Sequence, residues 1–208
     1  MDLSFPLSTI APTLDAGVLQ VLSATTAGCT AAEAHRRLGR GSDEGVRKVL
    51  SRLVAQGVVV VETPARYPIY HLNREHLAVP HIEALTRVRG ELLDRVRAEV
   101  GSWVVEPIHA GLFGSFARGT ADSDSDIDVL LIRPAALTDV EDADWLEQVD
   151  RLDRHIRTWT GNMAQIIDLS PVTLTQMVRE RDPLIEAWRA DDIPVLGERI
   201  LDLLRVMR

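Results

Sequence analysis

The sequence has little cysteine, few aromatic residues and no long apolar run. Cys29 is the only cysteine among 208 residues, which excludes an intramolecular disulfide and fits a reducing compartment. No apolar stretch approaches the roughly 20 residues that span a bilayer, and the N-terminus lacks the basic-then-apolar pattern of a signal peptide. Internal repeats and low-complexity tracts are absent too. We therefore expect a cytoplasmic protein with no membrane partner.

The hydrophobic content and the charge distribution indicate a globular chain with two different surfaces. Hydrophobic residues make up 46% and aromatic residues 4%, so the core is aliphatic, and the length suits two small domains or one mid-sized domain. The net charge of −8 is unevenly spread: residues 1–75 hold 8 basic and 7 acidic residues, and residues 76–208 hold 15 and 24. An acidic bulk charge argues against non-specific coating of nucleic acid, which is a polyanion.

The N-terminal third alternates apolar periodicity with turn and capping signals. The pattern predicts an irregular arm over residues 1–13, three helices over residues 14–26, 30–38 and 42–56, and strands over residues 58–61 and 69–72 around a loop at 64–68. Thr30 with Glu33 forms a candidate capping box, and Ser42 is a second candidate N-cap. Three helices followed by a β-hairpin is the element order of a winged helix-turn-helix.

Residues 46–58 resemble the recognition helix and first wing strand of bacterial winged-helix regulators. The resemblance implies that this helix enters the major groove and that the hairpin tip touches the backbone. The DNA-binding candidates are Arg36, Arg37, Arg47, Lys48, Arg52 and Arg66, with Arg40 alongside. The alternative is a module for dimerisation or protein contact, because Asp43 and Glu44 at the helix start oppose phosphates.

A single helix is expected next, opened by Pro80 and ending near Gly101. Its apolar stripe packs on one of the two halves or pairs with a second copy of the chain, so a homodimer is one possible assembly. The predicted organisation is α+β: a winged helix domain at residues 1–75, a linker helix at 76–103 and a second domain at 104–208.

The second domain carries the densest cluster of chemically active residues. An alternating segment from Ile108 to Leu112 runs into Gly114 and Ser115, predicted to form a turn between two strands. Two carboxylates, Asp126 and Asp128, then enter an apolar strand at spacing i, i+2, which places them on one side. Like charges so close repel unless a cation neutralises them, and hard oxygen ligands suit Mg²⁺. The glycine turn can bring backbone N–H groups close to a phosphate.

These residues resemble the nucleotidyltransferase superfamily of DNA polymerase β type, and most closely its small minimal members. Gly114, Ser115, Arg118 and Gly119, followed by Asp126 and Asp128, match the family pattern without a gap. The resemblance covers residues 104–197. The resemblance implies a short mixed sheet flanked by helices, and transfer of a nucleoside monophosphate from an NTP such as ATP to an acceptor. It implies Mg²⁺ or Mn²⁺ on Asp126 and Asp128, and triphosphate binding by Gly114, Ser115 and Arg118.

The sequence departs from the family at the third carboxylate. Active members carry an acid early in a neighbouring strand, and the pattern laid on residues 164–168 puts Gln165 there instead. Asp168 lies three residues further along, so it points to the opposite face unless a bulge intervenes. Gln165 is the preferred catalytic residue and Asp168 is the alternative. Gln cannot accept a proton, so slow turnover or a regulatory role is expected.

Three functions remain open from the sequence. The first is a metal-dependent nucleotidyltransferase with a DNA-binding winged helix. The second is a DNA-binding transcriptional regulator whose nucleotidyltransferase domain senses a nucleotide and is weakly active or inactive. The third is a component of a toxin–antitoxin pair, in which the enzyme modifies a partner. Neither the acceptor nor the NTP can be read from these residues.

Overall fold

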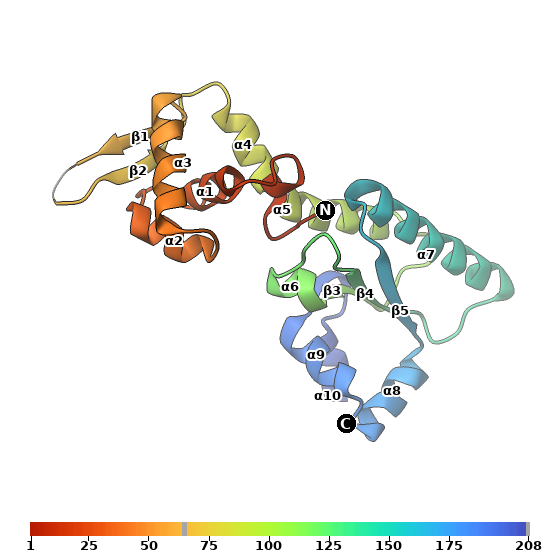
Figure 1. Cartoon of the computed structure of the whole chain (residues 1–208). Coiled ribbons are helices and arrows are strands. Elements are labelled where there is room, and N and C mark those ends of the chain that lie inside the picture. Colours follow the sequence, from red (N-terminus) through yellow and green to blue (C-terminus); the bar gives the residue numbers. More distant parts are fainter. Residues whose placement is uncertain (64–65, 207–208) are drawn as a thin grey trace. The chain divides into compact units, whose positions relative to one another are not determined.

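The computed structural model describes residues 1–63 and 66–206, and its contacts divide the chain into two compact units (Figure 1). The N-terminal unit comprises residues 4–89 with Asp2, and the C-terminal unit runs from residue 90 onward with Met1 and Leu3. No helix in the described part of the chain is long and apolar enough to cross a membrane. Each unit has its own buried residues and is considered separately.

The N-terminal unit contains three helices, a two-stranded antiparallel ribbon and a fourth helix. The elements are α1 (Leu14–Ser23), α2 (Ala31–Leu38), α3 (Asp43–Ala55), β1 (Val59–Glu62), β2 (Ile69–Leu72) and α4 (Val79–Thr86), after a short 3₁₀ turn, η1 (Pro6–Thr9), in the segment expected as an arm. The order of helices and strands is the predicted one. The predicted loop at 64–68 includes residues 64 and 65, which lie outside the described residues.

The helices of this unit begin where side-chain caps satisfy their free N–H groups. The Thr30 hydroxyl accepts from the Glu33 N–H at 3.2 Å, and the Glu33 carboxylate accepts from the Thr30 N–H at 2.9 Å, which confirms the capping box. The Ser42 hydroxyl accepts from the Gly45 N–H at 3.0 Å at the start of α3. Side chains of α1, α2, α3 and both strands then share one apolar core.

The helix predicted as a single linker is two helices, α4 and α5 (Val88–Val100), which meet at Arg87. The Arg87 N–H bonds to the Ala84 carbonyl, three residues back, so the last turn of α4 is tightened. The helix is interrupted because the two parts of its apolar stripe are buried in different units. Val79 of α4 packs into the core of the N-terminal unit, whereas Val96 of α5 is buried in the C-terminal unit.

The C-terminal unit is a four-stranded mixed sheet flanked by helices, which confirms the predicted α+β class. After α5 its elements are β3 (His109–Phe113), α6 (Gly114–Arg118), β4 (Ile127–Ile132), α7 (Asp139–Thr160), β5 (Ala164–Leu169), α8 (Pro171–Glu180), α9 (Pro183–Asp191), β6 (Ile193–Gly197) and α10 (Ile200–Val206). The strand order is β5-β4-β3-β6. Strands β4 and β5 are parallel, and the other two pairs are antiparallel.

Helices cover the two faces of this sheet differently. Alternate residues of β4, including Leu130 and Ile132, pack with residues of α8, α9 and α10 in one apolar cluster. The other face carries α7, whose buried Trp145 contacts Trp103 edge-on at a centroid distance of 5.4 Å. Figure 1 shows α7 on one side of the strands and α8–α10 on the other. The face of α8–α10 also carries the residues that concern function.

Candidate functional site

The two carboxylates lie at the start of β4. Asp126 is exposed just before the strand, and Asp128, its second residue, is half-buried. Burial raises the pKa of Asp128 above the usual aspartate range, the charge of Asp126 raises it further, and Arg118 partly opposes the shift. The pair is therefore an electrostatically strained site, because two like charges are held close together and one is partly removed from water.

Gly114 makes room for the carboxylate of Asp128. In the β3–β4 register, Phe113 lies opposite Asp128, and Gly114 follows with φ of 66°, in the left-handed region. A Cβ atom at residue 114 would lie 2.1 Å from Oδ2 of Asp128. Glycine alone fits, since any side chain would meet both the backbone penalty and this overlap. The carboxylate thus lies directly against the backbone at the start of α6.

The segment predicted as a Gly-Ser turn is the first turn of the five-residue helix α6. The helix follows β3 without a loop and ends at Gly119, also left-handed, with φ of 72°. Ser115 is half-buried in this helix, and its carbonyl accepts from the Thr120 N–H at 2.9 Å. Glycines at both ends explain the helix: one opens it against Asp128 and the other terminates it.

Arg118, at the end of α6, is tied to α9. Its guanidinium forms an ion pair with Asp191, the last residue of α9, whose side chain is 15% exposed. Arg118 itself is half exposed, and its charge reaches Asp128. Asp191 was not anticipated, because a carboxylate 73 residues away in sequence gives no local signal of the contact.

The neighbour of Asp128 on β5 is Gln165. The parallel register pairs Asp128 with Gln165 and Leu131 with Asp168. Paired residues of neighbouring strands project on the same face, so Gln165 shares the face of Asp128, and Asp168 lies on the opposite one. The structure therefore brings Gln165, and not Asp168, to the carboxylate pair.

Asp168 has a separate set of partners on the α7 side. Arg133 binds both its carboxylate oxygens, with Nε at 3.1 Å from Oδ1 and Nη2 at 2.5 Å from Oδ2. The indole of Trp145 donates to Oδ2 at 3.0 Å. The tentative catalytic assignment of Asp168 does not fit this placement, because the carboxylate is already engaged by an arginine fork away from Asp126 and Asp128.

A buried asparagine holds the loop that leads into Asp126. Nδ2 of Asn162 donates to the carbonyls of Asp122 and Ser125 at 3.1 and 2.8 Å, and Asn162 is 3% exposed. Asn162 was not singled out from the sequence, because its partners lie 40 and 37 residues away along the chain. The loop also bonds within itself, since the Ser125 hydroxyl donates to Asp122 at 2.8 Å.

The carboxylate pair fits a hard divalent cation, although the donor set is small. Asp126 and Asp128 offer carboxylate oxygens, which Mg²⁺ prefers, and their repulsion is relieved by a cation. Among residues 1–63 and 66–206, no group of three or more His, Cys, Asp or Glu side chains gathers around a metal position. The site thus offers two carboxylates at the start of β4, and the neighbouring strand β5 offers the amide of Gln165.

The predicted DNA-binding cations of α3 are all paired with carboxylates. Nε of Arg47 lies 2.7 Å from Asp43, Nζ of Lys48 lies 2.7 Å from Glu44, and Arg52 pairs with Asp15 of α1. Arg36 and Arg37 are exposed on α2, and the guanidinium of exposed Arg66 lies 5.5 Å from the Tyr67 ring centroid. The cations are on the surface, but α3 carries its own neutralising acids.

Comparison with known proteins bears on the C-terminal unit. Residues 90–175 match the family model described as a nucleotidyltransferase domain. Similar solved structures include a toxin–antitoxin with AMP-PNP, at 16% identity and a TM-score of 0.36, covering 55% of this chain and 82% of that one. Another is a variant of the toxin–antitoxin MntA-HpeT, at 14% identity and a TM-score of 0.37, with the same coverage. A comparison with curated proteins gave no match.

Proposed function

We propose that the chain moves a nucleoside monophosphate from an NTP to an acceptor at Asp126 and Asp128, and the match of residues 90–175 to the family model of a nucleotidyltransferase domain supports this. The observation that carries the assignment is the Asp128 carboxylate, which lies against Gly114 with its pKa raised by burial and by Asp126. An ordinary surface loop does not require a glycine that makes room for a half-buried carboxylate beside a like charge. A site that binds a cation and a phosphate does require such an arrangement.

In this proposal Asp126 and Asp128 hold Mg²⁺ or Mn²⁺. The bound ion would neutralise triphosphate charge and the charge that develops during displacement at the α-phosphorus. The half-buried position of Asp128 lowers the local dielectric, which strengthens its attraction for a cation. Asp126, being exposed, keeps the site open to solvent on one side.

Gly114, Ser115 and Arg118 are the proposed nucleotide-binding residues. The backbone N–H of residue 115 and its hydroxyl are donors for a phosphate oxygen, and the missing side chain at residue 114 permits close approach. Arg118 adds a positive charge that already reaches Asp128. Its ion pair with Asp191 anchors α6 to α9, so the guanidinium is partly shared between holding the helix and facing phosphate.

The transfer requires a proton to leave the acceptor. The acceptor oxygen forms a bond to the α-phosphorus, pyrophosphate departs, and the acceptor proton passes to a base or to water. Gln165 shares the face of Asp128 but cannot accept that proton. We therefore propose slow turnover, with water or one of the two aspartates as proton acceptor.

The same glutamine supports a second candidate, a nucleotide sensor that binds an NTP without turning it over. Incubation with each of four NTPs and Mg²⁺, followed by measurement of pyrophosphate release and of nucleotide binding, separates the two. Binding with release supports transfer. Nucleotide binding without pyrophosphate release supports the sensor, provided that every candidate acceptor, including the chain itself, has been supplied in the assay. Absence of binding contradicts both proposals.

Substitutions on β5 test the proposed roles of Gln165 and Asp168. We expect Gln165→Asp to leave pyrophosphate release unchanged or raise it, because it adds a proton acceptor beside Asp128. Asp168→Asn is expected to lower stability by about 1–3 kcal/mol, because the Arg133 fork loses a charged partner. Pyrophosphate release, the melting temperature and the NTP affinity of both variants are the measurements. The preference for Gln165 is contradicted if Asp168→Asn abolishes transfer without any loss of stability while Gln165→Ala leaves transfer unchanged.

For the N-terminal unit we propose sequence-specific DNA binding, supported by three helices before an antiparallel ribbon and by exposed Arg36 and Arg37. Replacing both with Ala should weaken DNA binding. The slope of log affinity against log salt concentration should become shallower by about 2, since each phosphate contact contributes roughly −0.9. Arg87→Ala is the control for loss of an exposed charge. The measurement is DNA affinity against salt concentration, after selection from random duplexes. If no sequence is selected, the unit serves protein contact instead.

A further inference from the structure

The C-terminal unit has a hollow of about 650 Å³ on α8 and α9 that the proposed transfer does not use. Its size falls in the range of small-molecule sites. Ile185 and Val178 form its apolar part, and Ile185 is 4% exposed. Charged residues complete the lining: Arg179, Arg181 and Arg189, with Asp182 and Glu186.

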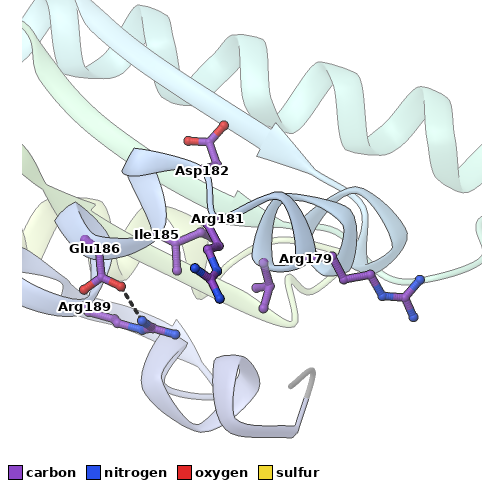
Figure 2. Close-up of a pocket in the computed structure, with 7 residues that line it drawn as sticks. Arg179, Arg181, Asp182, Ile185, Glu186 and Arg189 are labelled. Carbon is purple, nitrogen blue, oxygen red and sulfur yellow. Dashed lines mark hydrogen bonds and ion pairs between the residues drawn. The ribbon is translucent and has the colours of Figure 1, made fainter.

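The carboxylates of the hollow are already engaged. The Asp182 side chain accepts from the Leu184 N–H at 2.9 Å and so caps α9, and Glu186 pairs with Arg189. Within the described residues, the guanidinium of Arg181 has no ion-pair partner. Figure 2 shows Arg181 extending toward the side where Arg189 lies, whereas Arg179 points away. Two guanidiniums therefore face one hollow in a unit whose charge is mainly acidic.

The backbone at Arg181 adds an independent observation. Arg181 caps the C-terminus of α8 with φ of 57° and ψ of 45°. It is the only non-glycine residue with a positive φ in the described part of the chain. Glycine or asparagine takes this position at low cost, and an arginine is strained there. The presence of a long cationic side chain at a strained backbone position indicates that this side chain has a role.

We propose that this hollow binds a small molecule through an oxyanion group, phosphate or carboxylate, held by Arg181 and Arg189 over the apolar floor of Ile185. A guanidinium fork matches either group with two parallel hydrogen bonds. Glu186 competes with the ligand for Arg189. The site is distinct from Asp126 and Asp128 and does not depend on nucleotidyl transfer.

Two substitutions with opposite effects test the site. Arg181→Gly removes the guanidinium and relaxes the backbone, so anion affinity should fall about fivefold to tenfold while the melting temperature stays or rises. Glu186→Gln frees Arg189, so affinity should rise by up to about fivefold. The measurement is ¹H–¹⁵N NMR titration at constant ionic strength, with inorganic phosphate in one series and citrate in another. Arg154→Ala, an exposed arginine of α7, is the control.

Saturable shifts of the amides of residues 178–189, sensitive to both substitutions, support the site, and the tighter anion identifies the oxyanion group. Shifts at residues 178–189 that neither substitution alters overturn the proposal. So do shifts confined to residues 114–119, which would place the anion at the transferase site. Because no nucleotide or metal is added, failure here leaves the nucleotidyl-transfer proposal standing, and the converse also holds.

Discussion

Asp128→Asn is expected to abolish metal-dependent NTP binding and to lower transfer at least about 100-fold, while the melting temperature stays or rises. A bound metal contributes several kcal/mol to the reaction, and each 1.36 kcal/mol is tenfold in rate. Asparagine keeps the shape of aspartate but not its charge, so it fits against Gly114 equally well. The combination of lost function and retained stability distinguishes a functional carboxylate from a structural one.

The sign of the pH dependence follows from the raised pKa of Asp128. The folded chain binds a proton there more readily than the unfolded chain, so ionisation of Asp128 opposes folding. This unfavourable contribution is absent below the ordinary aspartate pKa, develops as the pH rises from that pKa through the raised one, and is complete above the raised pKa. The stability advantage of Asp128→Asn should therefore be greatest above the raised pKa and disappear in acid.

Calorimetric titration of each variant with an NTP, with and without Mg²⁺, measures the effect on binding. Asp124→Asn is a matched control, because it removes one exposed carboxylate from the same loop and should change neither affinity nor melting temperature. The double variant Asp126→Asn with Asp128→Asn should bind no more tightly than Asp128→Asn alone. Unchanged Mg²⁺-dependent affinity in the double variant would show that the carboxylates are not the metal site.

Gly114→Ala is expected to disable the site by displacing Asp128. The new Cβ would lie 2.1 Å from Oδ2 of Asp128, so the short carboxylate side chain must move by an ångström or more. A misplacement on that scale costs about 100-fold in rate. Stability should fall as well, since an alanine at φ of 66° is unfavourable by about 1–2 kcal/mol.

Gly119→Ala separates the two causes. Gly119 closes the same helix at φ of 72°, but a Cβ there meets no atom within 4 Å. The Gly119→Ala variant therefore has the backbone penalty without the overlap, and its loss of stability should be smaller than that of Gly114→Ala. Denaturant unfolding and NTP titration of both variants are the measurements. Equal loss of NTP affinity in the two would mean that helix α6, and not contact with Asp128, sets the effect.

Much of the local structure could be predicted because the signals were local. The capping box at Thr30 and the N-cap at Ser42 lie within three residues of the N–H groups that they bind. Alternation along residues 164–168 placed Gln165 and Asp168 on opposite faces, as the β4–β5 register does. Thr138 and Glu141 form a further capping box at the start of α7, and its signal is equally local.

The candidate site was predicted in part for the same reason. Gly114, Asp126 and Asp128 lie within fifteen residues, and a strand–turn–strand interpretation brings them together. The interpretation was wrong about the turn, because helix α6 occupies it. Helix α6 also buries Phe116 and pairs Arg118 with Asp191, and neither contact is visible in the local pattern.

By itself, the sequence determined the order of helices and strands in the N-terminal unit, the α+β class and the positions of the paired carboxylates, because periodicity, caps and strand alternation act over a few residues. Only the tertiary structure decided which distant charges meet: Arg118 with Asp191, Arg133 with Asp168, and Arg52 with Asp15. It also decided that β6 pairs with β3 and that one linker helix is two. Such contacts arise when buried faces pack, and packing joins residues whose separation along the chain carries no signal.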